Sequence, residues 1–391
     1  MVGVLWMLAW LGVSATWQRR SFWTAENLLA STFYGDESIR SGFAFSTVAG
    51  LALYLILYSL LGAIFAAILL ASLSGSAVAD TAALAAILVP MMRQAGYNPE
   101  RACGLMAAGG IIAPVIPPSI GFLLFGVVAN VSITRLFLAG IVPGVMMGGA
   151  LVVAWWAVSR RASVELAPRK PWGERAALLG KGVWALMLPV IIIGGLKFGI
   201  FTPTEAAVVA AVYALFVGAV VYRELTWKST YHCLLVAART TAVVLLLASL
   251  ASVASYMITI ADIPGQVGGW LSVLGDHPLA LTAAMMLAVF LAGMVLDFIP
   301  IVLIFTPVLL PIAQQAGIDP IYFGVIFIIN CSLGMITPPV GVVLNVVSSI
   351  GKVTLGQAAR GVLPFLLAEL AVLVALVLFP ALVMVPAGWW R

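Results

Sequence analysis

Apolar runs separated by short polar links fill most of the chain. Many runs reach about 17 to 25 residues, the length that an α-helix needs to cross the hydrocarbon core of a bilayer. The shorter ones predict the halves of hairpins that enter and leave the membrane on one side. We place membrane elements at approximately residues 2–17, 46–71, 78–95, 102–116, 119–140, 143–158, 183–199, 203–222, 233–259, 279–296, 301–316, 321–336, 340–350 and 363–388. The pattern predicts an all-α polytopic membrane protein, because backbone polar groups in hydrocarbon are satisfied within helices.

One segment of the chain occurs twice. Residues 74–143 reappear without a gap 221 positions later as residues 295–364. Seven identities among the 29 positions from Pro90 to Pro118 share this offset, which argues against chance. The matched positions are Pro90 with Pro311, Gln94–Gly96 with Gln315–Gly317, Pro99 with Pro320, Pro117-Pro118 with Pro338-Pro339, and Pro143 with Pro364. A duplicated hydrophobic unit interrupted by Gly and Pro predicts a secondary transporter with two inverted repeats and a site between their broken helices.

The duplication divides the chain into five stretches. Residues 1–72 form an N-terminal membrane segment, and residues 73–143 form the first repeat with its hairpin. Residues 144–276 hold connecting and scaffold helices, and residues 277–364 form the second repeat with its hairpin. Residues 365–391 are expected to form a C-terminal membrane helix.

Two interruptions recur inside each repeat. Gly96 to Pro99 and Gly317 to Pro320 predict a helix end followed at once by a helix start, because Gly suits a left-handed cap and Asn or Asp suits an N-cap before Pro. The proline pairs Pro117-Pro118 and Pro338-Pro339 remove backbone donors and free carbonyls one turn back. Such breaks are tolerated at membrane depth where protein, water or an ion supplies partners.

Small hydroxyl and carboxylate residues stand at the start of each repeat. Ser72 to Asp80 opens the first, and Gly293 to Asp297 opens the second. Such a hairpin tip offers carbonyl and side-chain oxygens to a hard cation. A carboxylate within the membrane is a functional candidate, although Asp80 equally suits a helix-capping role.

A second group of polar and small residues lies on and after the breaks. Asn330, Gly334 and Thr337 precede the second proline pair, and Gly109 and Gly110 precede the first. Close helix packing is the alternative for the two adjacent glycines. Asn130, Asn345 and Ser348 follow the breaks and would line a substrate path, with a helix terminus as the alternative for Asn130.

Composition and charge exclude several classes of function. Charged residues make up 8% of the chain, and the net charge of +5 is concentrated in short links such as Arg160 to Lys181. This distribution indicates cytoplasmic loops rather than a nucleic-acid partner. No GxxxxGK[ST] loop is present, so we expect no ATP use. The three cysteines and two histidines show no metal-ligand spacing. Thr202 to Glu205 predicts a structural capping box.

Several motifs together resemble the large membrane subunit of tripartite ATP-independent periplasmic (TRAP) transporters. They are Ser74 to Asp80, Gly96 to Pro99, Pro117 to Ile120, Leu136 to Gly144, Phe201 to Glu205, Gly317 to Pro320 and Thr337 to Gly341. The resemblance runs from about Leu60 to the C-terminus, whereas residues 1–59 do not match the usual beginning of the family.

The resemblance implies a multi-pass protein of the bacterial inner membrane that imports a small organic acid with sodium by an elevator motion. Implied partners are a periplasmic substrate-binding protein and a small membrane subunit, with Na⁺ as coupling ion and no other cofactor. We expect substrate contacts at Ser74, Gly75, Ser76, Pro117, Ser119, Asn130, Asn345 and Ser348, and sodium ligands among Asp297, Asn330, Gly334, Thr337, Gly109 and Asp80. The alternatives are an ion-coupled anion carrier that needs no binding protein and a membrane-embedded enzyme.

Overall fold

The computed structural model describes residues 75–159, 172–223, 225–271 and 277–388, and this part of the chain is helical and contains no strand. The elements are α4 (Ala77–Gln94), α5 (Pro99–Gly110), α6 (Ile120–Ala129), α7 (Ile133–Ser159), α8 (Trp172–Lys197), α9 (Pro203–Phe216), the π-helix η2 (Val217–Val221), α10 (Trp227–Ile260), α11 (Ile263–Leu271), α12 (Pro278–Gly293), α13 (Phe298–Gln315), α14 (Pro320–Gly334), α15 (Val342–Gly351), α16 (Leu355–Leu378) and α17 (Ala381–Gly388). The predicted all-α fold is confirmed. The predicted N-terminal segment, residue Ser74 and the basic link after α7 lie outside the described residues.

The apolar helices of the described residues fall into a long and a short group. Within the described ranges, five helical segments are long and apolar enough to cross a membrane: Ile133–Ser159, Pro203–Val221, Trp227–Ile258, Phe298–Gln315 and Leu355–Leu378. Helices α6, α12, α14 and α15 are apolar but shorter, as expected of half-helices and hairpin arms.

Two predicted boundaries are wrong. The expected runs 119–140 and 143–158 are instead α6 and the single helix α7, and the break between them lies at Asn130, which ends α6 with φ +53. Helix α7 continues through Pro143, and α16 continues through Pro364. A proline removes one backbone hydrogen bond, and packing against neighbouring helices tolerates this loss within membranes.

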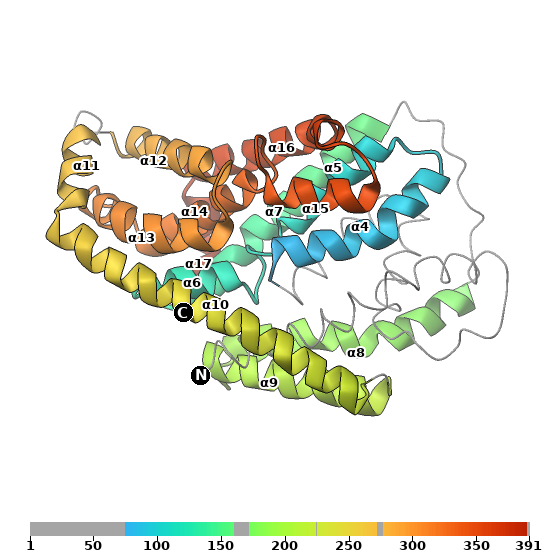
Figure 1. Ribbon diagram of the computed structural model, residues 1–391. Coiled ribbons are helices and arrows are strands. Elements are labelled where there is room, and N and C mark those ends of the chain that lie inside the picture. The colour runs from blue at the N-terminus through green and yellow to red at the C-terminus, as the bar shows by residue number, and fades with distance from the viewer. Residues whose placement is uncertain (1–74, 160–171, 224, 272–276, 389–391) are drawn as a thin grey trace.

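The sequence repeat is a repeat of structure. Helices α4 and α13 begin and end at positions with the same offset, and α5 with α6 corresponds to α14 with α15. The matching turn inside each repeat has the expected chemistry: Gly96 and Gly317 have φ +86 and +77, and Asn98 and Asp319 cap the following helices. In Figure 1, α4 and α13 each begin near the middle of the molecule and run toward opposite ends. The repeats are therefore inverted relative to each other.

The two repeats interlock through their short helices. Helix α6 of the first repeat packs against α13 and α14 of the second, and α15 of the second packs against α4 and α5 of the first. Aromatic residues fill the first of these contacts: Phe125 lies 6.4 Å from Phe323 and 5.8 Å from Phe327 between ring centroids. Each half-helix is thus held mainly by the other repeat.

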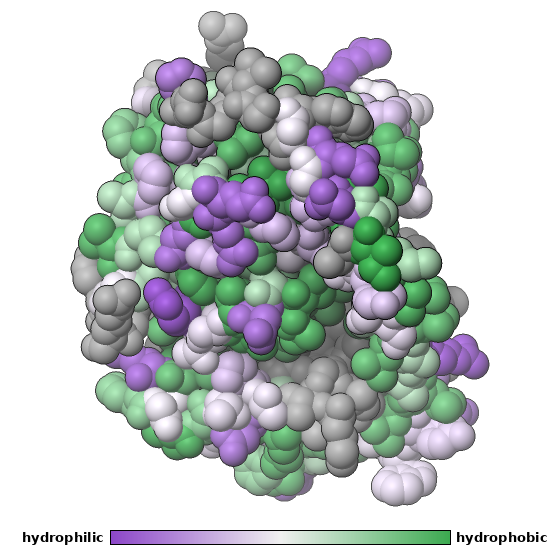
Figure 2. Space-filling model, turned by 90° about the vertical axis from the view of Figure 1, so that its left-hand side faces the viewer, coloured by the Kyte–Doolittle hydropathy of each residue, from purple (hydrophilic) through white to green (hydrophobic). Residues whose placement is uncertain are grey.

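Exposed polar residues collect at the two ends of this helical body. One end carries Asp262, Gln266, His277, Gln314 and Gln315 near the termini of α10 to α13. Figure 2 views the molecule from this side and shows hydrophilic side chains gathered among hydrophobic ones. The opposite end carries Arg93, Gln94, Asn98, Lys352 and Arg360. Because charged groups favour the membrane–water boundaries, the starts of α4 and α13 lie between the boundaries, at membrane depth.

The connecting helices α8, α9 and α10 lie to one side of the repeats (Figure 1). Helix α10 crosses the structure diagonally and contacts α13. The predicted capping box at α9 is confirmed, with Thr202 N donating to Glu205 Oε2 at 2.8 Å and Glu205 N to Thr202 Oγ1 at 3.3 Å.

Candidate functional site

The first hairpin tip, Gly75 and Ser76, lies directly on the first proline break. Gly75 has φ +67, and a Cβ added there would lie 2.5 Å from the carbonyl oxygen of Pro118. Only glycine therefore permits this approach of two backbones. Ser76 is the N-cap of α4, where its hydroxyl accepts from Ala79 N at 3.5 Å. The tip and the break form one oxygen-rich junction.

The second hairpin tip, residues 294–297, meets the second break in the same way. Val340 N donates to Met294 O at 3.2 Å. Gly334 packs on Gly293 so closely that a Cβ added to Gly334 would lie 2.5 Å from Gly293 Cα. Asp297 caps α13 by accepting from Phe298 N at 2.8 Å, and its side chain is exposed.

Both breaks follow the same course. Helices α5 and α14 end at Gly110 and Gly334, and the chain then tightens into turns in which Ala113 N donates to Gly110 O and Thr337 N to Gly334 O. The peptides Pro117-Pro118 and Pro338-Pro339 are cis. Within the described residues, the carbonyls of 116–118 and 336–339 accept no hydrogen bond from a backbone N–H. Each break therefore leaves main-chain oxygens without a backbone partner, whereas the carbonyls of Gly334 and Met335, one turn before the second proline pair, accept from Thr337 N and Val343 N.

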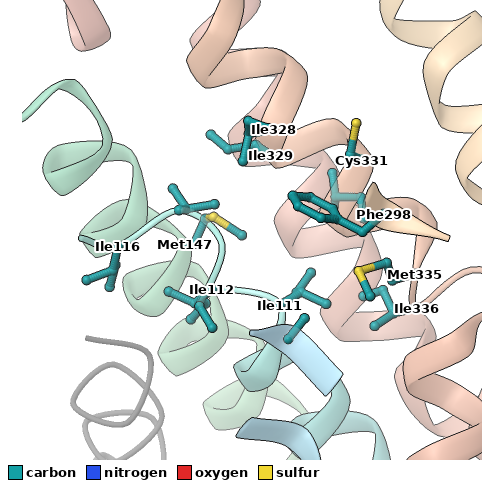
Figure 3. Packing of buried hydrophobic residues seen from close by; sticks show 14 of the residues in the cluster. Ile111, Ile112, Ile116, Met147, Phe298, Ile328, Ile329, Cys331, Met335 and Ile336 are labelled. Atoms are coloured by element: carbon teal, nitrogen blue, oxygen red, sulfur yellow. The ribbon is translucent and has the colours of Figure 1, made fainter. Parts of the chain in front are cut away.

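The two junctions adjoin each other. A Cβ added to Gly121, at the start of α6, would lie 2.7 Å from Cζ of Phe298, at the start of α13. Figure 3 shows Phe298 beside α14, with Met335 and Ile336 of the second break on one side and Ile111 and Ile112 of the first break facing them. Apolar side chains thus separate the junctions from one another and keep water from their inner sides.

Hydroxyl groups complete the oxygen set at the breaks. Ser119 caps α6 by accepting from Phe122 N at 3.0 Å, and its own hydroxyl donates to Pro114 O. The Thr337 hydroxyl donates to Leu333 O at 2.8 Å and is buried. Since a hydroxyl that donates its proton keeps lone pairs, Thr337 retains the capacity to coordinate a cation.

Other predicted site residues make hydrogen bonds near the junctions or end a helix. Asn345 Nδ2 donates to Val340 O at 2.8 Å, and Ser348 Oγ donates to Asn345 O at 2.9 Å. Asn330, one turn before Gly334, donates to Met286 O at 2.5 Å and ties α14 to α12. Asn130 lies at the far end of α6 and ends that helix.

Three further predicted residues lie near the first tip. A Cβ added to Gly110 would lie 1.8 Å from Thr81 Oγ1, so this glycine serves close packing of α5 on α4. Gly109 is buried, and its carbonyl accepts from Ile112 N at 3.3 Å. Asp80 is buried in the first turn of α4, where a negative charge interacts favourably with the helix dipole.

Across the described ranges, no group of three or more His, Cys, Asp or Glu residues gathers as a transition-metal site would require.

Sequence reasoning missed one buried carboxyl. Glu369 lies in α16, is fully buried, and neither of its oxygens has a hydrogen-bond partner in the described structure. A glutamate in the apolar run 363–388 is the signal that points to it.

Inverted broken-helix repeats, whose hairpin tips meet the breaks at membrane depth, define a secondary transporter rather than an enzyme. Residues 61–382 match the family model for the tripartite ATP-independent periplasmic transporter, DctM component. The chain belongs to this family, the large permeases of TRAP transporters, and is a multi-pass protein of the bacterial inner membrane.

Known proteins similar to this chain agree with that assignment. The chain is 53% identical over 316 residues to the 2,3-diketo-L-gulonate TRAP transporter large permease protein YiaN of Escherichia coli, covering 81% of this chain and 74% of that protein. It is 38% identical over 307 residues to the sialic acid TRAP transporter large permease protein SiaM of Vibrio cholerae, covering 78% and 72%. It is 34% identical over 351 residues to the C4-dicarboxylate TRAP transporter large permease protein DctM of Pseudomonas aeruginosa, covering 90% and 78%.

A solved structure shares the fold. The Alcanivorax borkumensis YdaH transporter, described as having an unusual topology, matches with a TM-score of 0.68 at 15% identity, over 97% of this chain and 84% of that one.

Proposed function

We propose that this permease imports a small organic acid together with Na⁺. The observation that carries the proposal is the pair of junctions, in which Gly75 lies on Pro118 O and Met294 O accepts from Val340 N. Sodium prefers several oxygen ligands without a fixed geometry, and main-chain carbonyls with a nearby hydroxyl supply them. Thr337 is the hydroxyl ligand proposed at the second junction, beside the carbonyl of Gly334, with Asp297 supplying charge from the tip.

The substrate that we propose carries a carboxylate and binds at the second break, where helix α15 begins. Helix α15 begins at the second break with Gly341 as its N-cap and without a side-chain cap. Val343 N donates to Met335 O at 3.1 Å, and the positive end of the helix dipole favours an anion at this helix start. The relatives named above are named for 2,3-diketo-L-gulonate, sialic acid and C4-dicarboxylates, all of which are organic acids. The identity of 53% makes a keto sugar acid the first substrate to test.

The proposed partners follow from family membership. A periplasmic binding protein would deliver the substrate, and a small membrane subunit would brace the scaffold while the hairpin-bearing part moves as an elevator. An anion carrier that works alone is the alternative outcome of the test below.

Reconstitution in liposomes tests the proposal. The permease, its small subunit and its binding protein are assayed for uptake of labelled 2,3-diketo-L-gulonate, sialic acid and a C4-dicarboxylate with and without an inward Na⁺ gradient. We expect uptake of one of these acids only with the gradient and the binding protein. Uptake at the same rate without Na⁺ contradicts sodium coupling, and uptake without the binding protein favours the carrier that works alone.

A further inference from the structure

The carboxyl group of Glu369 lies in the middle of the apolar helix α16, between Leu355 and Leu378. The residue is fully buried, and both side-chain oxygens are without a hydrogen-bond partner in the described structure. A carboxylate buried without a partner is among the most costly groups in a protein interior, whereas a protonated carboxyl is neutral.

An unsatisfied donor lies on the same helix interface. Phe365 precedes Glu369 by one turn and shares its face of α16. The ring of Phe365 stacks on that of Trp155 from α7 at 6.0 Å between centroids. Nε1 of Trp155 is buried and also has no partner among the described residues. The α7–α16 interface therefore contains a buried, unsatisfied N–H, and the unsatisfied acid of Glu369 lies one turn further along the same face of α16.

Few titratable groups lie on the helices that pack against α16. The titratable groups of the described helices that pack on α16 are Glu100, Arg101 and Cys103 on α5, Arg135 on α7, and Tyr322 and Cys331 on α14; α12, α15 and α17 carry none.

Three of these groups bond to backbone carbonyls away from Glu369. Arg101 Nη1 donates to Arg360 O at 3.1 Å, about two turns before Glu369. Tyr322 Oη donates to Leu376 O at 3.1 Å, about two turns after it. Cys103 Sγ donates to Val347 O on α15 at 3.8 Å.

The remaining groups supply no salt bridge to Glu369 either. Arg135 is roughly 30 Å from Trp155 along α7. Glu100 carries the same sign of charge, and the thiol of Cys331 is buried within α14. Tyr97, whose ring lies 5.5 Å from that of Trp155, is a phenol that is neutral at neutral pH, and burial raises its pKa further.

We propose that Glu369 is a proton-binding site in α16, occupied by a proton in this conformation. On deprotonation the carboxyl O–H bond breaks, the proton passes to water, and the carboxylate needs a donor such as the Trp155 N–H. This step requires α16 to shift against α7 and admit water, so a rise in pH weakens the present conformation. The proton site is separate from the sodium junctions and goes beyond the proposed function.

Infrared spectroscopy of the full chain in lipid vesicles tests the proton directly. We expect the spectrum of the wild-type protein at neutral pH to contain the carbonyl stretch of a protonated carboxyl. This band should be missing from Glu369→Gln. It should be retained in Glu100→Gln, the matched control at the start of α5. If Glu369→Gln leaves the carboxyl region unchanged, the proposal is overturned. This measurement needs no substrate and no sodium, so its outcome is independent of the transport test.

Uptake against pH supplies the functional readout. Glutamine reproduces the neutral acid, so Glu369→Gln should match the wild-type rate at neutral pH and lose the wild-type decline at alkaline pH. Identical pH profiles, or a folded glutamine variant that is inactive at neutral pH, contradict the proposal. Glu369→Leu shows whether the carboxyl has a partner. Replacing an unpartnered polar group with an apolar one should keep or raise the Tm of the protein at pH 9 relative to wild type. A Tm clearly below that of wild type would mean that the carboxyl has a partner, which contradicts the proposal.

Discussion

Replacing Gly334 with alanine probes the contact on which the second junction depends. The new Cβ would lie 2.5 Å from Gly293 Cα and 2.6 Å from Gly293 C, whereas ordinary van der Waals contact is 3.4–4 Å. Both neighbours are backbone atoms, so no side chain can rotate away. Helix α12 must therefore move from α14 by roughly 1 Å, which carries the tip away from the break.

The energetic cost follows from this displacement. Overpacking a close interface costs about 1–3 kcal/mol. The Val340 N to Met294 O bond, already 3.2 Å long, lies next to the contact and would be stretched. If Na⁺ binds where the tip meets the break, the strain opposes its binding. The half-saturating Na⁺ concentration for uptake should then rise roughly 5- to 150-fold.

Uptake over a series of Na⁺ concentrations in proteoliposomes measures this change. Gly149→Ala is the matched control, because Gly149 lies inside α7 with nothing within 4 Å of its added Cβ. This control should keep the wild-type Na⁺ dependence and gain slightly in stability, since alanine favours helix. A Gly334→Ala protein that folds and keeps the wild-type Na⁺ dependence would refute the assignment of a cation to the second junction.

Three further substitutions separate coordination from structure. Thr337→Val removes a buried hydroxyl at nearly constant volume, so Na⁺-driven uptake should fall at least about tenfold. Thr337→Ser keeps the hydroxyl and should restore uptake. Equal uptake in the two variants would exclude the hydroxyl as a ligand. Asp297→Asn keeps an N-cap but loses the charge, so we expect reduced uptake at unchanged Tm. Asp297→Ala should lose uptake and also about 1 kcal/mol of stability, because it removes the cap as well. Wild-type uptake in both variants would remove Asp297 from the site. Asn330→Leu removes the hydrogen bond between α14 and α12 and should cost about 0.5–1.5 kcal/mol in thermal unfolding, because Met286 O lies inside α12 and keeps its intrahelical partner. The Na⁺ dependence of the remaining uptake should be unchanged; a shifted Na⁺ dependence at wild-type stability would instead make Asn330 a ligand.

Local chemistry explains which features could be predicted from the sequence. Gly96 and Asn98 form the predicted cap and restart, and Thr202 forms the predicted capping box. Each depends on residues within a few positions of one another, so the amino-acid types suffice. The breaks at the two proline pairs were predictable for the same reason. Pro143 was misread because a single proline ends some helices and is tolerated in others, depending on neighbours that the pattern does not contain.

The sequence by itself determined the membrane class, the duplicated units, and the positions of the turns and breaks, because hydrophobic length and the backbone limits of Gly and Pro are local properties. Only the tertiary structure decided that α6 packs on the opposite repeat, that Asn330 bonds to Met286 O, and that Glu369 is buried without a hydrogen-bond partner. These contacts join residues far apart in the chain. Their formation depends on how side-chain volumes fit when helices pack, which hydrophobic periodicity leaves open.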